Sequence, residues 1–123
     1  MAAAAKLLIH PIKDATIVNI EELRILDSLE VEQIGAELYS LVDDKNRKKL
    51  IIDFTKVRIL SSSALGMLLT LRKKAEAIKG TLILCGLRDD LKKVFKISGL
   101  DRLFTFAENE EAALSMFGIT PAG

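Results

Sequence analysis

One short segment, Leu50-Ile-Ile-Asp-Phe54, limits the fold more than any other part of the sequence. It is an almost continuous apolar run, which is typical of a central strand that is buried on both faces of its sheet. The chain has 123 residues, a length that suits one compact domain. The sequence therefore predicts a sheet whose middle strand is Leu50–Phe54.

The rest of the chain alternates short apolar runs with segments of helical period. Leu7–Ile12 and Ala15–Ile20 are predicted to form a hairpin through Lys13-Asp14, and Pro11 indicates that the first strand lies at a sheet edge. Further strands are expected at Thr81–Cys85 and Leu103–Phe106, and helices at Asp27–Asp44, Ser61–Gly80, Asp89–Gly99 and Glu108–Phe117.

The resulting order, ββαβαβαβα, predicts a single α/β domain. Because strands separated by helices pair in parallel through right-handed crossovers, the sheet should be mixed and mostly parallel, with four or five strands and about four flanking helices. Two helices should turn these residues inward: Ala64, Leu68, Leu71, Ala75 and Ile78 in the one after the serines, and Ala113, Met116 and Phe117 in the last.

The balance of charge excludes some classes of function. The formal net charge is +1, from 18 basic and 17 acidic side chains. This gives no strong long-range field, so nothing favours nucleic acid or an anionic membrane as a partner. No apolar run approaches the roughly 18 residues of a membrane span, and the N-terminus lacks a signal-peptide pattern. The single cysteine, Cys85, cannot form an internal disulfide, which favours a cytoplasmic setting.

The sequence also lacks a recognisable catalytic or metal-binding constellation. His10 is the only histidine and has no partner at ligand spacing. Cys85 lies in an apolar strand and is expected in the core. Asp53 interrupts the buried strand; it either reaches the serine loop or, as is more common, bonds local backbone amides. We therefore expect no enzyme activity, no metal and no cofactor.

Three consecutive serines, Ser61 to Ser63, stand at a predicted helix start. A helix start exposes unpaired N–H groups and a partial positive charge, so a phosphate on a hydroxyl there gains donors and a favourable dipole. Serine is also the commonest kind of helix cap, and from the residue type alone capping is the favoured interpretation. Gly66, inside the same helix, either admits a neighbouring backbone or serves simple helix-to-sheet packing.

The strand Leu50 to Val57, followed by Ser61-Ser-Ser-Ala-Leu-Gly66 and a leucine-rich helix, resembles the STAS domain of anti-sigma factor antagonists. That family has a strand, a short loop and Asp-Ser-Ser/Thr-Gly-Leu-Gly at this place. Its later elements are matched by Gly80 to Cys85, Val94 to Leu100, Leu103 to Phe106 and Glu110 to Leu114. The resemblance implies a STAS domain over residues 7–117. The alanine run at the start predicts a loose or cloning-derived segment 1–6, and residues 118–123 are expected to form a flexible tail.

The resemblance implies a binding switch. In the family, the unphosphorylated domain sequesters an anti-sigma factor that is also a serine kinase, and phosphorylation of the first serine after the aspartate abolishes binding. Matched by position, Ser62 is the phosphoacceptor, with Ser61 and Ser63 as lesser candidates. The implied partner-binding residues are Asp27, Ser28, Leu29, Ser61, Ser62, Ser63, Ala64 and Met67.

Three positions depart from the family pattern. Ser61 replaces the aspartate, and Ala64 replaces a glycine and is expected to add a methyl group on the surface that a kinase approaches. Arg24 stands where many members have aspartate, although Asp27 follows closely enough to substitute. The alternatives to a phosphorylated switch are a constitutive or transporter-associated STAS module, a small-ligand sensor and a nucleotide hydrolase. Weak nucleotide binding is compatible with the switch.

Overall fold

The computed structural model describes residues 7–22, 24–25 and 27–119, so the expectations for residues 1–6 and 120–123 lie outside the described residues. Its strands are β1 (Leu7–Ile12), β2 (Ala15–Ile20), β3 (Arg24–Ile25), β4 (Lys49–Asp53), β5 (Ile59–Leu60), β6 (Thr81–Cys85) and β7 (Thr105–Ala107). Its helices are α1 (Ser28–Asp43), α2 (Ser62–Ala77), α3 (Asp89–Ile97), the short 3-10 helix η1 (Leu100–Arg102) and α4 (Glu110–Met116).

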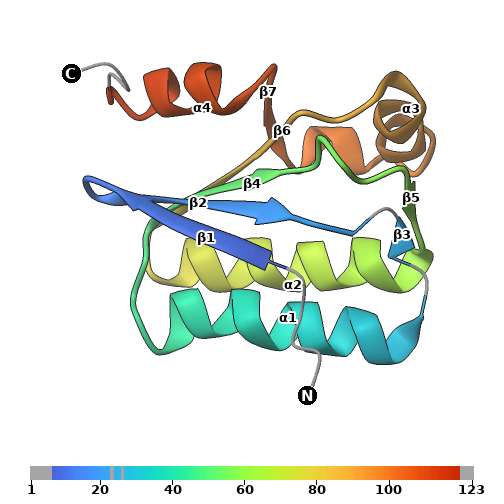
Figure 1. The fold of residues 1–123 in the computed structure, drawn as a ribbon, viewed down its shortest axis with the longest axis horizontal. Coiled ribbons are helices and arrows are strands. Elements are labelled where there is room, and N and C mark those ends of the chain that lie inside the picture. The colour runs from blue at the N-terminus through green and yellow to red at the C-terminus, as the bar shows by residue number, and fades with distance from the viewer. Residues whose placement is uncertain (1–6, 23, 26, 120–123) are drawn as a thin grey trace.

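The main sheet has five strands in the order β1-β2-β4-β6-β7 (Figure 1). β1 and β2 form the expected antiparallel hairpin, and β2, β4, β6 and β7 run parallel to one another. β4 is the middle strand, and Leu50, Ile51 and Ile52 have no exposed surface. The α/β fold class and the central place of Leu50–Phe54 are therefore confirmed.

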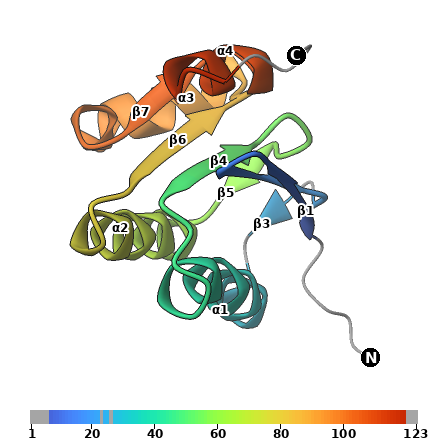
Figure 2. The same cartoon turned by 90° about the vertical axis from the view of Figure 1, so that its left-hand side faces the viewer.

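Successive residues of β4 point into two different cores. Leu50 and Ile52 pack in the larger cluster with the inward residues of α1 and α2, such as Leu38 and Leu68. Ile51 points to the opposite face, into the smaller cluster that includes Leu114 of α4. Figure 2 shows α1 and α2 together on one side of the sheet and α4 on the other. A strand's two-residue period thus divides the domain into layers.

α3 covers the end of the sheet near β7. Its Phe95 ring meets the rings of Phe104 and Phe106 edge to face, with centroids 5.6 and 5.4 Å apart. Such T-shaped pairs are favourable because the positive ring edge faces the negative ring face. Ile119, beyond α4, is also buried in the smaller core cluster.

The structure corrects the sequence reading at several element ends. The last strand is Thr105–Ala107, because Leu103 and Phe104, predicted as its start, belong to the turn that follows η1. A second sheet, in which β3 pairs in parallel with β5, was not predicted. Met116 does not point inward, since 53% of its surface is exposed. Ile78 and Phe117 are only half-buried.

The end of α2 also differs from the prediction. The left-handed residue after this helix is Lys79, with φ of 62°, and not Gly80. Gly80 has a different role, because a Cβ atom there would lie 2.6 Å from the carbonyl oxygen of Lys48. The backbone between α1 and β4 therefore passes too close to residue 80 for any side chain. Gly66, in contrast, is exposed and has open space around its Cα, so neither role considered for it, close approach of a backbone or helix-to-sheet packing, is observed.

These two glycines form a matched pair for a stability test. Gly80→Ala should lower the free energy of unfolding by about 1–3 kcal/mol, because the added methyl group forces the backbone of Lys48 to move. Gly66→Ala should raise it by up to about 1 kcal/mol, because alanine is the better helix former and meets no obstacle. Urea unfolding of both variants measures the effects, and equal effects would contradict the assignment.

The main core is tested by Leu68→Ala. Leu68 is fully buried between α2 and the sheet, so its truncation should lower the free energy of unfolding by about 2–5 kcal/mol through lost burial and a cavity. Lys73→Ala, at an exposed site of the same helix, is the control and should change it by less than about 0.5 kcal/mol. Chemical denaturation showing a loss below about 1 kcal/mol for Leu68→Ala would contradict this packing.

Candidate functional site

The serine loop, residues 61–63, is built by the small sheet and the start of α2. The Ser61 amide donates to the carbonyl of Ile25 in β3 at 2.9 Å, which continues the β3–β5 pairing by one residue. Ser61 has extended backbone angles, φ −81° and ψ 167°, and its hydroxyl accepts from the amide of Ala64 at 3.1 Å. Ser61 is therefore the helix cap.

Capping by Ser61 leaves the next two hydroxyls available. Ser62 and Ser63 are exposed, and neither hydroxyl forms a hydrogen bond within the described ranges. Ser62 is the first residue of α2, where the backbone N–H groups of the opening turn face outward. The two interpretations of the serines thus apply to different residues: Ser61 supplies the cap, and Ser62 has the position of an accessible acceptor.

The start of α1 lies beside this loop, at the same end of the molecule (Figure 1). Asp27 caps α1, because its carboxylate accepts from the amide of Leu29 at 2.8 Å. Ser28 is exposed, and Leu29 exposes 62% of its surface although it is apolar. The structure brings together two segments that the sequence analysis placed in one surface, namely 27–29 and 61–63.

The remaining two residues of that surface are buried. Ala64 has no exposed surface, so the expectation that its methyl group faces a kinase is wrong. Helical geometry explains this, because residue 64 begins the inward face that continues at Leu68 and Leu71. Met67 is 6% exposed and packs near Gly35 of α1. It lines a shallow groove of about 340 Å³ between α1 and α2, together with Ser63 and Gly66.

A polar cluster lies on the opposite face of the sheet, between the sheet and α4. Asp53 is 9% exposed, and one carboxylate oxygen accepts from the Thr55 amide at 2.8 Å and from the Thr55 hydroxyl. The Asn19 amide group donates to the other oxygen at 3.1 Å and to Glu110 of α4 at 2.6 Å. Of the two roles considered for Asp53, local bonding is thus the one observed.

The two carboxyl groups of this cluster shift each other's pKa in opposite directions. The hydrogen bond to Asp53 raises the pKa of Glu110 above its usual value, and desolvation raises it further. Desolvation also pulls the pKa of Asp53 upward, but hydrogen bonds from Glu110, Thr55 and Asn19 outweigh it and hold that pKa below its usual value. Of the two groups, Glu110 therefore keeps its proton to the higher pH.

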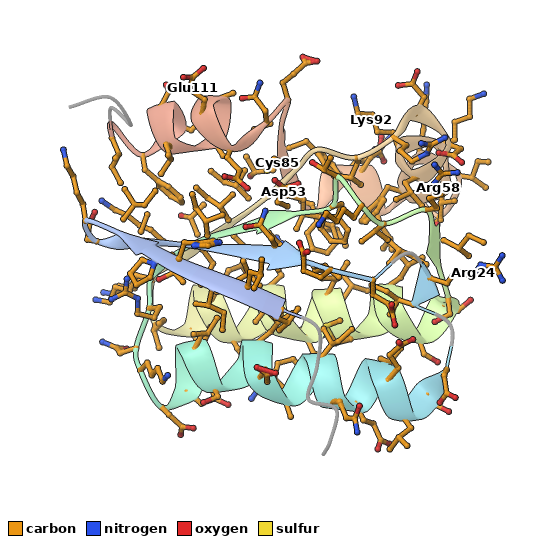
Figure 3. The ribbon with its side chains drawn as sticks, viewed as in Figure 1. Arg24, Asp53, Arg58, Cys85, Lys92 and Glu111 are labelled. Carbon is orange, nitrogen blue, oxygen red and sulfur yellow. The ribbon has the colours of Figure 1, made fainter. Side chains whose placement is uncertain are left out.

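Cys85 lies next to this cluster, and Figure 3 shows it with Asp53 between the sheet and α4. The thiol is buried, and desolvation followed by the negative charges of Asp53 and Glu110 raises its pKa to about 12. A thiol with so high a pKa is a poor nucleophile near neutral pH. The expected core role of Cys85 agrees with its burial.

Sequence reasoning did not find the Asn19–Asp53–Glu110 cluster. Its members come from β2, β4 and α4, far apart in the chain, although Asn19 and Asp53 are register partners in neighbouring parallel strands. The available signal was a polar residue near the carboxyl end of two adjacent apolar strands. In the part of the chain that the structure describes, no group of three or more His, Cys, Asp or Glu residues is placed to hold a metal ion.

Comparison with known proteins finds one domain family that matches most of this chain. The family model for the STAS domain matches residues 8–113. BtrV of Bordetella bronchiseptica, whose name describes it as a candidate anti-sigma factor antagonist, is 33% identical over 93 residues, which is 76% of this chain and 79% of BtrV. None of the helices in the described ranges is long and apolar enough to cross a membrane.

Solved structures are similar over nearly the whole chain. An anti-sigma factor antagonist (STAS) domain protein from Planctomyces limnophilus has a TM-score of 0.80 at 23% identity, covering 93% of this chain and 99% of that one. SpoIIAA of Bacillus, in its phosphorylated form, has a TM-score of 0.69 at 25% identity, covering 90% of this chain and 98% of that one.

The raised pKa of Glu110 predicts a pH dependence of stability. A carboxyl group with a raised native pKa stabilises the fold at low pH, and this contribution is lost as pH rises through that pKa. Glu110→Gln keeps a donor toward Asp53 at every pH, so its melting temperature relative to wild type should rise from pH 4 to pH 8. Glu111→Gln, the exposed neighbour in the same helical turn, is the control. Parallel pH profiles for both variants and wild type would contradict the raised pKa of Glu110.

Proposed function

The chain belongs to the STAS domain family, and on that premise we propose that it acts as an anti-sigma factor antagonist. In its unphosphorylated form it binds an anti-sigma factor that is also a serine kinase, and so keeps that protein from its sigma factor. It does so by binding alone, in the cytoplasm, and catalyses no reaction itself. The contact surface is the exposed end formed by residues 27–29 and 61–63.

The observation that carries this proposal is the separate role of two adjacent serines. Ser61 is engaged as the cap of α2, whereas the Ser62 hydroxyl is exposed and bonded to no described group. A kinase can therefore phosphorylate Ser62 without removing the hydrogen bond that begins the helix. The related SpoIIAA of Bacillus has a solved phosphorylated form, which supports a modification of the same kind here.

The mechanism is a change of charge at an interface. The kinase transfers the γ-phosphoryl group of ATP to the Ser62 oxygen, and the hydroxyl proton is released. The phosphate adds about −1.5 to −2 charges at neutral pH. At the start of α2 it meets outward N–H groups and the positive end of the helix dipole, so the folded domain tolerates it. Within a desolvated interface the same charge weakens binding.

Ser62→Asp tests this mechanism. The anti-sigma factor is first identified by affinity purification from native cells with the wild-type chain. Its binding by Ser62→Asp should then be at least about tenfold weaker in calorimetry, because an added negative charge enters the interface. Ser62→Ala should bind as wild type does. Both variants should unfold within about 0.5 kcal/mol of wild type, since Ser61 and not Ser62 caps the helix.

The matched control is Ser115→Asp, which adds the same charge at an exposed serine of α4 on the other side of the sheet. It should bind normally. Equal affinities of wild type, Ser62→Asp and Ser62→Ala for the anti-sigma factor would contradict the assignment of Ser62 as the switch. Binding that depends on Ser62, with no phosphate found on it in cells, would instead favour the constitutive STAS module.

A further inference from the structure

The small sheet beside the serine loop carries two arginines, Arg24 and Arg58, called here the arginine pair. Arg24 is opposite Ile59 in the register of β3 with β5, and Arg58 directly precedes Ile59. Both are exposed, and Figure 3 places both at the end of the molecule where β5 leads into α2. Through the 2.9 Å bond from the Ser61 amide to Ile25, this sheet is joined directly to the serine loop.

The arginine pair has no carboxylate partner within the described ranges. Ion pairs do form elsewhere on the surface, where Lys49 meets Asp14 at 2.7 Å and Lys74 meets Asp43 at 2.8 Å. Within the described chain, the side chains of Arg24 and Arg58 take part in no ion pair and no hydrogen bond. Asp27, at the adjacent start of α1, is engaged by the Leu29 amide. Two guanidinium groups therefore face solvent on the small sheet that leads into the serine loop.

The surroundings of the pair have the character of a protein interface. Ile59 and Leu29 expose 42% and 62% of their surfaces, so apolar area lies at the same end as the cations. Arginine beside exposed apolar side chains is enriched in interfaces. α3 lies at this end as well (Figures 1 and 2) and adds the exposed lysines Lys92, Lys93 and Lys96. This end of the molecule thus carries several exposed cations, together with the carboxylates of Asp27, Asp89 and Asp90.

We propose that the arginine pair binds an acidic face of the anti-sigma factor, and that a phosphate on Ser62 breaks this contact from within the chain by pairing with the same two guanidinium groups. The inference rests on the proposed function and adds the charge of the partner and the route by which the phosphate acts. The phosphate then competes with the partner's carboxylates, in addition to repelling them.

The charges balance closely enough for such competition. The arginine pair carries two positive charges, and a phosphoserine carries about −1.5 to −2 at neutral pH. Guanidinium groups bind phosphate through two parallel N–H donors, a geometry that lysine cannot copy. The contact with the phosphate is intramolecular, so it is favoured by a high effective concentration over a contact with a separate protein. One modification therefore removes the attraction to an acidic partner.

The first test needs no partner. The chain is produced with phosphoserine at position 62, and phosphorus NMR follows the second ionisation of the phosphate. In Arg24→Gln/Arg58→Gln the pKa of this phosphate should lie about half a unit or more above its value in the otherwise wild-type chain. The control is Lys45→Gln/Lys48→Gln, which removes the same charge after the far end of α1, where the backbone of Lys48 lies against Gly80. Equal values in all three chains, or an equal shift in the control, would overturn the pairing.

The second test is a double-mutant cycle in binding to the anti-sigma factor. Arg24→Gln/Arg58→Gln should weaken binding at least about tenfold and reduce its sensitivity to salt. Adding Ser62→Asp to that variant should weaken binding less than twofold further, because the charges on which the aspartate acts are already gone. Fully additive losses of binding free energy would overturn the pairing of the charge at residue 62 with the arginine pair. Normal binding by Arg24→Gln/Arg58→Gln would overturn the acidic partner face.

These results are separable from the proposed function. If Ser62→Asp alone binds like wild type, the switch assignment fails, yet the phosphate titration still decides whether the arginine pair contacts a phosphate at position 62. If Ser62→Asp alone weakens binding and the cycle is additive, the assignment of Ser62 as the switch is supported. Only the pairing of its charge with the arginine pair is then contradicted.

Discussion

The complete burial of β4 is the constraint on which the rest of the structure depends. A strand with Leu50, Ile51 and Ile52 fully buried must have a partner strand on each side and a layer of helices on each face. Its alternation sends Leu50 and Ile52 toward α1 and α2, and Ile51 and Asp53 toward α4. One residue of shift would exchange the two faces, so the register of β4 determines where each polar group of the domain lies.

This alternation explains why the domain has two separate polar sites. Asp53 follows Ile52 and therefore points to the α4 side, where it contacts Glu110 and Asn19. The serine loop belongs to the helix that covers the other face. Ionisation of the carboxyl pair acts on how α4 is held, whereas a charge added at Ser62 would act on the exposed start of α2. The two effects use different contacts and need not be coupled.

Sequence patterns revealed the long elements because those elements carry a repeated signal. α1, α2 and the three central strands each bury several residues at regular spacing, and their burial outweighs local propensity. β3 and β5 have two residues each, so no period exists to be read, and their pairing depends on Ile25 and Leu60 meeting across 35 positions of sequence. The place of Gly80 could not be deduced either, since the steric demand comes from Lys48, a residue of another segment. The Asn19–Asp53–Glu110 cluster was missed for the same reason.

The serine loop shows where local chemistry stops being informative. Three identical side chains have equal propensity to cap a helix, and the choice among them is made by the tertiary structure. The amide of Ser61 is bonded to β3, which holds Ser61 in the extended conformation that a cap requires. Ser62 is then the first helical residue, and Ala64 and Leu68 anchor its helix in the core. A helix anchored in this way has little freedom to move when charge is added at its exposed end. A phosphate on Ser62 would therefore act through its charge and not by moving the helix. The residues that determine its effect would then be the charged residues on the same surface.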